Sequence, residues 1–247
     1  MKTLQRKMIE GLKNYIFPIF CLNCKKEGVW VCGKCKSSLV VKRTCCCPIC
    51  RAINEFGEYC FNCKKDSFLY SHNSIFKYAE DSLIEKIIYT FKYKYVEDII
   101  YILKYSLQEY FKKNFEVFKD IDLIIPIPLH PRRFAERGFN QAELIANNVG
   151  GFLNKDIISD IIVRNRYTEV QAKLNKGSRI KNIAGAFSIN SHVKKFGMEL
   201  ENKDSIIGKN ILLVDDVFTT GSTMQECAKI LRQNGAKKIY GFTIARG

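Results

Sequence analysis

Apolar residues gather along the chain in short runs that polar turns separate. The runs lie at 122–128, 157–163, 184–189, 211–214 and 238–245. Runs of this length, bounded by Pro, Gly and charged residues, predict β-strands. We also predict a short connecting strand at 74–78 and a polar excursion over 191–209. The run at 211–214 is apolar throughout, which favours a buried strand of a parallel sheet.

Other stretches carry apolar residues at the spacing of a helix. One apolar face combines positions 84, 87, 88 and 91, and a second combines 99, 103, 107 and 111. The break between Tyr93 and Val96 predicts two separate helices. Asn140 followed by Glu143 predicts a capped helix that runs to about residue 152.

The first 20 residues begin basic and carry Leu4, Met8, Leu12 and Ile16 at helical spacing. Such a segment can pack on the body of the protein or lie on a membrane surface. Charged residues at 10 and 13 interrupt the apolar core that a signal peptide needs. No apolar run approaches the roughly 20 residues that span a bilayer. We therefore expect a cytoplasmic protein, either free or peripheral at the inner face of the membrane.

The segment 211–223 carries the strongest chemical signal. Its buried run is followed by Asp215 and Asp216, and then by a Thr-Thr-Gly-Ser-Thr turn at 219–223 that opens a helix near Ser222. Backbone N–H groups, hydroxyls and the positive end of a helix dipole suit a phosphate. The two acids would repel phosphate but suit sugar hydroxyls or Mg²⁺. The segment predicts a site for a ribose 5-phosphate, and the alternative is an ordinary strand-to-helix turn with two exposed acids.

Two basic segments suit the anionic parts of such a ligand. Arg132, Arg133 and Arg137 follow the strand at 122–128 on a predicted loop, where guanidinium groups grip oxyanions. The alternative is a solvated basic turn. The stretch 164–182 holds six Lys+Arg and one Glu, and it is too long for a tight connection. Such a stretch predicts a lid over an anionic ligand.

Lys92 and Lys94 alternate with aromatic residues at 91, 93 and 95. A basic and aromatic group of this kind can contact a nucleic-acid backbone or stack on bases. The alternative is a helix end whose aromatic rings join the core and whose lysines are solvated.

The charge of the chain is strongly positive and unevenly distributed. The formal net charge is +15 and the isoelectric point is near 9.3. Residues 1–66 hold 13 Lys+Arg against 5 Asp+Glu, so this first quarter is the more basic. Such a balance suggests a polyanionic partner, such as nucleic acid, or an anionic membrane surface. The alternative is a lysine-rich proteome in which a basic surface is common background.

Ten of the eleven cysteines lie between Cys21 and Cys63. Eight of them form four CxxC pairs: Cys21 and Cys24, Cys32 and Cys35, Cys47 and Cys50, Cys60 and Cys63. Two CxxC turns complete a tetrahedral four-cysteine site for Zn²⁺, so the spacing predicts two structural zinc sites. We favour sequential pairing of neighbouring CxxC turns over a cross-braced arrangement, which spacing leaves open. Cys45 and Cys46 are surplus, and one of them is an alternative ligand to Cys47.

In this order, the segments resemble the ComF family, the competence-associated phosphoribosyltransferase-like proteins. The resemblance rests on the double CxxC segment, IIYTFKYK around 86–94, PIPLHPRRFAERGFNQAELIA at 126–146, the series Arg164, Gln171, Leu174, Arg179, Asn182, Ala186 and Phe187, LLVDDVFTTGST at 212–223, and the terminal Ala245-Arg246. It covers nearly the whole chain. Phe218 and the long acidic polar stretch at 199–204 depart from the family pattern, and we expect neither to touch the phosphate chemistry.

The resemblance implies a type I phosphoribosyltransferase fold over 67–247, with a mostly parallel sheet and helices on both faces, after a double zinc ribbon at 1–66. By motif it assigns Asp215 and Asp216 to the ribose hydroxyls and Mg²⁺ of phosphoribosyl pyrophosphate (PRPP). It assigns the 5-phosphate to Thr219, Thr220, Gly221, Ser222 and Thr223. The pyrophosphate and lid set comprises Arg132, Arg133, Arg137, Arg164, Gln171 and Arg179, with Asn182 beside it.

Three functions fit this resemblance. The first is a PRPP-binding protein that handles incoming single-stranded DNA during natural transformation, alone or with other competence or DNA-processing proteins. The second is an enzyme that transfers ribose 5-phosphate from PRPP to a nucleobase-like acceptor, although no base-recognising segment is evident. The third is a regulator that senses PRPP and binds protein partners. Since a fold does not by itself imply an activity, the sequence leaves the acceptor and the oligomeric state open.

Overall fold

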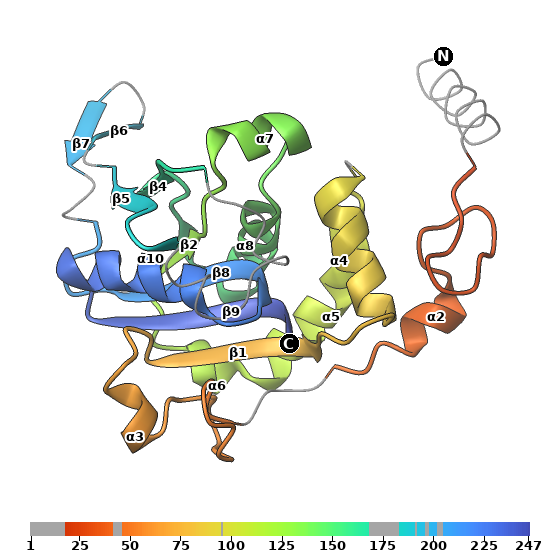
Figure 1. The fold of residues 1–247 in the computed structure, drawn as a ribbon, viewed down its shortest axis with the longest axis horizontal. Coiled ribbons are helices and arrows are strands. Elements are labelled where there is room, and N and C mark those ends of the chain that lie inside the picture. The colour runs from red at the N-terminus through yellow and green to blue at the C-terminus, as the bar shows by residue number, and fades with distance from the viewer. Residues whose placement is uncertain are drawn as a thin grey trace.

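A five-stranded parallel sheet forms the centre of the molecule (Figure 1). The computed structural model describes residues 18–41, 46–94, 96–167, 183–190, 192–195, 198–201 and 205–247. The strands are β1 (Ser71–Lys77), β2 (Leu123–Pro126), β3 (Asp156–Ile157), β8 (Asn210–Phe218) and β9 (Lys238–Arg246). Their order is β1-β9-β8-β2-β3, and every neighbouring pair is parallel. The expected α/β architecture with a mostly parallel sheet is confirmed.

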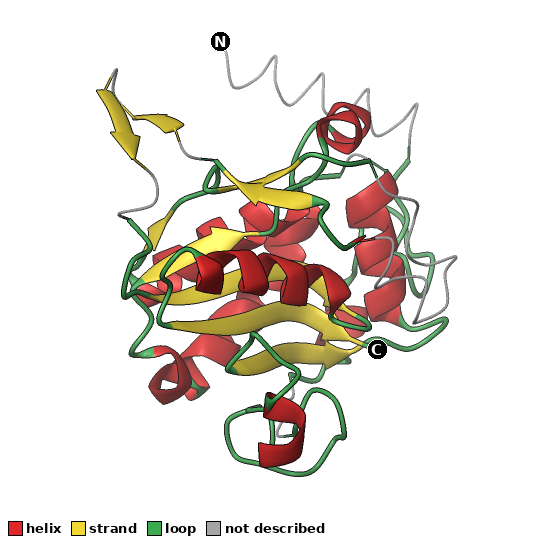
Figure 2. Cartoon of the chain, turned by 60° about the vertical axis from the view of Figure 1, so that its left-hand side comes forward, coloured by secondary structure: helices red, strands yellow, loops and turns green. Residues whose placement is uncertain are grey.

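Helices cover both faces of the sheet, as Figure 2 shows. On one face lie α4 (Leu83–Tyr93), α5 (Ile99–Lys113), α6 (Phe115–Phe118) and α8 (Gln141–Leu153), and on the other lies α10 (Ser222–Gln233). Leu212 and Val214 of β8 join the first apolar cluster, whereas Ile211 and Leu213 join the second. This alternation follows from the two-residue period of a strand. The two predicted helices at 84–91 and 99–111 are confirmed, with their predicted apolar residues buried.

Two predicted elements differ from the structure. The run at 157–163 is not one strand, because it divides between β3 in the main sheet and β4 (Ile162–Arg164) outside it. Ser159 and Asp160 form a bend between them, where polar residues let the chain leave the sheet. β4 pairs with β5 (Phe187–Ile189) in an antiparallel ribbon. The predicted polar excursion contains a second ribbon, β6 (His192–Lys195) and β7 (Met198–Glu201).

The predicted arginine loop is in fact a helix, α7 (Pro131–Arg137). Pro131 occupies its first turn, and the Nδ1 atom of His130 accepts a hydrogen bond from the N–H of Arg132 at 3.2 Å. The helix ends at Gly138, whose φ of 74° lies in the left-handed region. A Pro at the start and a Gly just past the end are typical helix signals. The prediction of a loop was therefore wrong.

Two small cysteine-bearing modules precede and flank the sheet. The first cysteine module, residues 18–41, contains α2 (Gly33–Ser37) and packs beside Leu83 at the start of α4. The second cysteine module, residues 46–66, contains α3 (Phe61–Lys64) and lies along β1. There the N–H of Tyr59 donates to the Tyr70 carbonyl at 3.3 Å, and the N–H of His72 donates to the Gly57 carbonyl at 2.9 Å. The second module thus covers an edge strand that would otherwise expose unpaired backbone.

This contact explains why β1 begins at Ser71, earlier than the predicted 74–78. Its first four residues are polar, yet none is more than 1% exposed. The amide of Asn73 donates to the Phe56 carbonyl at 3.2 Å, and His72 Nε2 lies 3.1 Å from Thr243 Oγ1. These partners offset the cost of burying the Asn73 amide and the Nε2 atom of His72. The boundary at residue 66 stays a prediction.

The predicted N-terminal amphipathic stretch lies outside the described residues. Within the described ranges, no helix combines the length and apolar character that crossing a bilayer requires.

Candidate functional site

The sequence-predicted acids and arginines meet at one end of the sheet. β2 continues through α8 to β3 on one side, whereas β8 continues through α10 to β9 on the other. The chain therefore leaves the adjacent strands β2 and β8 in opposite directions. Open α/β sheets bind ligands at such a switch point, outside the carboxyl ends of the strands. Here the end of β8 carries the acid pair, and the end of β2 leads into α7.

Asp215 and Asp216 belong to β8 itself, and a lysine on α4 neutralises one of them. Lys92 Nζ lies 2.9 Å from Asp216 Oδ1, and the Asp216 side chain is 8% exposed. Burial lowers the pKa of Lys92, but the charges of Asp216 and Asp215 outweigh it and raise the pKa overall. Lys92 thus stays protonated. Burial and the charge of Asp216 raise the pKa of Asp215 to about 7.

The turn at residues 219–223, hereafter the phosphate turn, leads from β8 into α10. Gly221 has a φ of 76° and forms the N-cap of α10, a twelve-residue helix. A Cβ at Gly221 would lie 2.4 Å from the Phe218 ring, so the turn accepts only glycine there. Thr219 and Thr223 line a pocket beside the acid pair, whereas Thr220 Oγ1 lies 2.7 Å from Ser222 Oγ. Phe218, expected to be remote from the phosphate chemistry, forms the floor of the turn.

Three of the predicted arginines face the acid pair across the pocket. Arg133 and Arg137 come from α7, and Arg164 comes from β4. Arg137 is 9% exposed, and its Nη1 donates to Gln141 Oε1 at 3.0 Å. Burial and the neighbouring Arg133 lower the pKa of Arg164. Clustered guanidinium groups in a recess favour a multiply charged anion.

Arg132 lies apart from this cluster. Its side chain is 68% exposed and its Nε lies 3.4 Å from Glu136. Its guanidinium carbon lies 4.7 Å from the ring centroid of Tyr167. Gln171, Arg179 and Asn182, predicted for the lid, lie outside the described residues, so their assignment stays a prediction.

The acid pair, its lysine, two threonines of the phosphate turn and the three clustered arginines surround one pocket of about 610 Å³. The lining includes Lys92, Asp215, Asp216, Thr219, Thr223, Arg133, Arg137 and Arg164. The sequence did not indicate that Lys92 lines this pocket; it allowed Lys92 and Lys94 either a nucleic-acid contact or a solvated helix end. Lys94 is exposed at the end of α4, and its nucleic-acid role stays a prediction.

The aromatic wall of the pocket was not foreseen either. Tyr89 and Tyr93 lie one turn apart on α4, with ring centroids 5.0 Å apart, and both line the pocket. They are 55% and 45% exposed. The Arg137 guanidinium carbon lies 5.2 Å from the Tyr93 ring centroid. The signal was present in the sequence as tyrosines spaced four apart around Lys92.

The eight paired cysteines gather into two groups, as sequential pairing predicts. Cys21, Cys24, Cys32 and Cys35 form one, and Cys47, Cys50, Cys60 and Cys63 form the other. In each group the sulfur atoms all lie within 4.8 Å of one another. Bonds of about 2.3 Å to a tetrahedral Zn²⁺ would separate sulfurs by about 3.8 Å, so both groups fit the metal.

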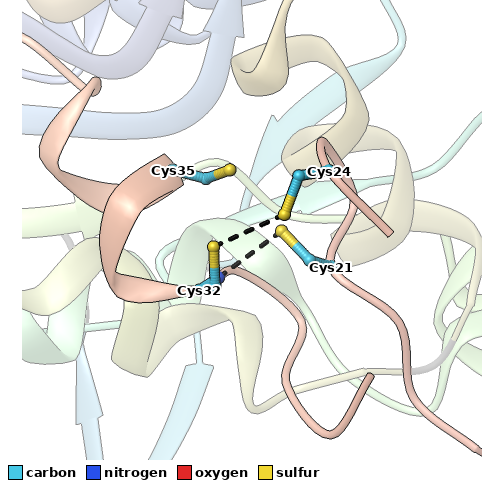
Figure 3. A group of neighbouring side chains, drawn as sticks. All are labelled: Cys21, Cys24, Cys32 and Cys35. Carbon is cyan, nitrogen blue, oxygen red and sulfur yellow. Dashed lines mark hydrogen bonds between the residues drawn. The ribbon is translucent and has the colours of Figure 1, made fainter. Parts of the chain in front are cut away.

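Figure 3 shows the first group, whose four side chains point toward a common centre. The N–H of Cys32 donates to Cys21 Sγ at 3.5 Å, and the Asn23 amide donates to Cys35 Sγ at 3.4 Å. Burial raises the pKa of Cys21, but N–H groups of Cys24, Cys32 and Asn23 outweigh it and bring the pKa to about 6. Cys47 in the second group reaches about 6 in the same way. Each group thus holds at least one thiol whose low pKa favours the thiolate that binds metal, whereas the pKa of Cys35 and of Cys63 is raised.

The surplus cysteines stand outside these groups. Cys46 Sγ accepts a hydrogen bond from Arg246 Nη1 at 3.6 Å instead of joining the second group. Cys45 lies outside the described residues.

Known proteins are similar to this chain in sequence over most of its length. The model of the phosphoribosyl transferase domain family matches residues 133–246. Competence protein F of Haemophilus influenzae (strain ATCC 51907 / DSM 11121 / KW20 / Rd) is 27% identical over 231 residues, which cover 92% of this chain and 90% of that protein. Competence protein ComFC of Bacillus subtilis (strain 168) is 29% identical over 225 residues, with coverage of 87% and 84%.

The DNA utilization protein YhgH of Escherichia coli O157:H7 is 34% identical over 125 residues, which cover 51% of this chain and 49% of that protein. The match to the phosphoribosyl transferase domain includes the acid pair, the phosphate turn and the three pocket arginines, whereas Lys92 and the tyrosines of α4 precede it. The two competence proteins align over most of the chain. The chain therefore contains a phosphoribosyl transferase domain and two four-cysteine groups, and over most of its length it is similar to proteins named competence protein F and ComFC.

Proposed function

We propose that this protein binds PRPP together with Mg²⁺ in the pocket at the switch point, and that it acts in the cytoplasm in DNA uptake. The observation that carries the proposal is the convergence of three unlike groups on one pocket. They are the acid pair of β8, the phosphate turn at the start of α10, and the arginine cluster of α7 and β4. PRPP carries a diol, a monophosphate and a pyrophosphate, so each group has a partner of suitable chemistry.

The chemistry of the residues assigns each part of PRPP to one group of side chains. Asp215 and Asp216 accept hydrogen bonds from the ribose hydroxyls, because ionised carboxylates are acceptors only. The N–H groups and hydroxyls of the phosphate turn hold the 5-phosphate at the positive end of α10. Arg133, Arg137 and Arg164 bind the pyrophosphate. Mg²⁺, when bound, would neutralise pyrophosphate charge, and the two Asp carboxylates are the oxygen donors suited to it.

Single-stranded DNA is the second ligand that we propose. Two relatives are named as competence proteins and a third as a DNA utilization protein. A separate groove of about 590 Å³ supports such a ligand. Its lining includes Lys64, Phe68, Tyr70, Arg232, Lys237 and Lys238. Lys238 Nζ lies 4.5 Å from the Tyr70 ring centroid, and Phe68 is 44% exposed.

Cationic side chains beside aromatic rings bind single strands through phosphate contacts and base stacking. The groove lies near the amino end of β9, whereas the proposed PRPP pocket lies at the carboxyl ends of the strands. The two ligands can therefore bind at different places. Other competence or DNA-processing proteins remain proposed partners on the same grounds.

The alternative function is an active transferase that moves ribose 5-phosphate from PRPP to a nucleobase-like acceptor. The exposed rings of Tyr89 and Tyr93 favour it, because they offer a planar acceptor a stacking surface inside the PRPP pocket. Positioning and neutralisation of the leaving pyrophosphate would supply the catalysis. Release of pyrophosphate that depends on an added base, and that is lost in Asp215→Ala/Asp216→Ala, would favour this alternative.

The PRPP proposal is tested by calorimetric titration of the zinc-loaded protein with PRPP, with and without Mg²⁺. The wild type should bind, and Asp215→Ala/Asp216→Ala should not. The matched control is Glu109→Ala/Glu116→Ala, which removes two acids that lie outside the pocket lining and should bind as the wild type does. Absence of binding in the wild type would refute the proposal.

The DNA proposal is tested by fluorescence anisotropy with a labelled single-stranded oligonucleotide across a series of salt concentrations. Lys64→Ala/Lys238→Ala should weaken binding and flatten the salt dependence, since fewer counterions are released. Lys104→Ala/Lys112→Ala removes two exposed lysines of α5 and serves as the control. Equal weakening in both variants would argue against the groove. Binding that survives Asp215→Ala/Asp216→Ala would favour separate sites.

A further inference from the structure

The phosphate turn rests on the second cysteine module, and Arg246 makes the first connection. Its side chain is 5% exposed, at the end of β9. The Nη2 atom donates to the Pro48 carbonyl at 2.7 Å, and Pro48 directly follows the metal-binding Cys47. The Arg246 guanidinium carbon lies 5.8 Å from the ring centroid of Phe218. One buried side chain thus joins the metal-binding loop to the floor of the phosphate turn.

Phe218 connects Arg246 to the phosphate turn, because its ring packs beneath Gly221. Its ring lies so close beneath Gly221 that a Cβ there would be 2.4 Å away. The His72 ring stacks on it with centroids 3.8 Å apart. The Phe218 carbonyl accepts from the N–H of Gly247 at 3.0 Å, and the Gly247 carbonyl accepts from Arg51 Nη2 at 3.0 Å. Arg51 belongs to the second module, so the module holds both the ring and the backbone of this residue.

Gln225 makes an independent connection on the far side of the turn. It lies in the first turns of α10, and its N–H donates to the Gly221 carbonyl at 2.8 Å. Its Nε2 donates to Tyr59 Oη at 3.0 Å and to Ser67 Oγ at 2.8 Å. Its Oε1 accepts from the N–H of Phe68 at 2.9 Å. Burial raises the pKa of Tyr59 to about 12, so its hydroxyl stays neutral. Tyr59 directly precedes the metal-binding Cys60.

The first cysteine module packs elsewhere. Cys21, Cys32 and Cys35 form an apolar cluster with Val31 and Leu83. Lys36 Nζ lies 5.7 Å from the ring centroid of Tyr105 on α5. In Figure 1, α2 lies beside α4, whereas α3 and the rest of the second module lie beneath β1. The two modules are thus chemically alike but support different parts of the fold.

We propose that the second four-cysteine site positions the phosphate turn, and that the first does not. Metal held by Cys47, Cys50, Cys60 and Cys63 fixes the Pro48 carbonyl and Tyr59, and through them Arg246 and Gln225. Loss of that metal frees both sides of the turn and weakens binding of a 5-phosphate. The arginine cluster, on α7 and β4, keeps its affinity for pyrophosphate. This inference rests on the proposed function, because it takes the turn as the 5-phosphate site.

The test compares matched cysteine variants of the full chain. Cys60→Ser/Cys63→Ser and Cys32→Ser/Cys35→Ser should each lose one zinc per chain in a chromogenic chelator assay. Calorimetry then measures ribose 5-phosphate and inorganic pyrophosphate separately. The Cys60/Cys63 variant should lose about tenfold or more in ribose 5-phosphate affinity, equivalent to about 1.4 kcal/mol, while its pyrophosphate affinity is kept. The Cys32/Cys35 variant should keep both affinities. Unchanged ribose 5-phosphate binding in the Cys60/Cys63 variant would overturn the inference.

A second variant leaves the metal ligands intact, in case the cysteine variants unfold. Gln225→Ala removes the side-chain hydrogen bond to Tyr59 of the second module and the two to Ser67 and Phe68, which directly follow it. It should retain two zinc ions and lose about fivefold or more in ribose 5-phosphate affinity alone. Gln233→Ala, at the exposed end of the same helix, is the control. If Gln225→Ala binds ribose 5-phosphate as tightly as the wild type does, then Gln225 does not position the phosphate turn and the inference is contradicted. If the wild type binds neither ribose 5-phosphate nor PRPP, the proposed function itself fails.

Discussion

Lys92 Nζ lies 2.9 Å from Asp216 Oδ1, so α4 supplies a cation to the acid pair at the end of β8. The two residues are far apart in sequence, and their side chains are 24% and 8% exposed. Two neighbouring carboxylates in a recess repel each other. The ammonium group of Lys92 offsets part of this repulsion. It therefore explains how the protein can place two carboxylates side by side before any ligand binds.

Lys92→Met should therefore destabilise the protein. The substitution leaves Asp216 buried without its cation, and we expect the free energy of unfolding to fall by about 1–3 kcal/mol. Urea denaturation measures the change. Lys94→Met, two residues away and exposed, should have little effect. The loss of stability should be smaller in Lys92→Met/Asp216→Asn, because residue 216 then carries no unpaired charge. Additive effects of the two substitutions would argue against the ion pair.

The raised pKa of Asp215 predicts a pH dependence of stability. Its pKa is about 7 in the folded protein, against an ordinary value of 3.8. The folded state therefore holds a proton that the unfolded state releases, and stability falls as pH rises between these two values. From pH 5 to pH 8, the wild type should lose about 2–3 kcal/mol relative to Asp215→Asn. Urea denaturation at several pH values compares the two proteins. Parallel pH profiles would show that Asp215 titrates outside this range.

Gly221→Ala should damage the phosphate turn. The new Cβ meets the Phe218 ring at 2.4 Å, and the φ of 76° disfavours any side chain. We expect a loss of about 1–2 kcal/mol in stability and about tenfold or more in ribose 5-phosphate affinity. Gly151→Ala on α8 is the matched control, because nothing lies within 4 Å of its Cβ position. Thermal unfolding and calorimetry report both effects. Equal stability and equal ribose 5-phosphate affinity of Gly221→Ala and Gly151→Ala would mean that the turn tolerates a side chain.

Local signals in the sequence were enough to predict much of this site. The strand, acid pair, turn and helix at 211–223 are contiguous, and so are the CxxC pairs that form each four-cysteine group. The apolar faces of α4 and α5 follow directly from helical spacing. In each case the residues that decide the structure belong to one short, continuous segment of the sequence.

The features that were missed depend on contacts between distant parts of the chain. The polar start of β1 does not resemble a buried strand, because the second cysteine module and Thr243 supply its partners. The Phe218 ring is held beneath the phosphate turn by contacts with Arg246 and His72, and the spacing of these residues in the sequence does not predict those contacts. Lys92 seemed a surface lysine for the same reason. The helix α7 is different: its Pro131 and Gly138 signals were local, and the arginines between them drew attention away.

The surplus cysteines offer a direct test of the metal assignment. Cys46 Sγ contacts Arg246 at 3.6 Å, whereas Cys47 Sγ belongs to the second group. Cys46→Ser should therefore retain two zinc ions per chain, and Cys47→Ser should retain one. Because metal binding supplies much of the folding free energy of a small cysteine module, Cys47→Ser should also expose residues 46–66 to protease. Native mass spectrometry counts the metal ions, and limited proteolysis locates the opened segment. Loss of zinc from Cys46→Ser, with Cys47→Ser unaffected, would exchange the two assignments.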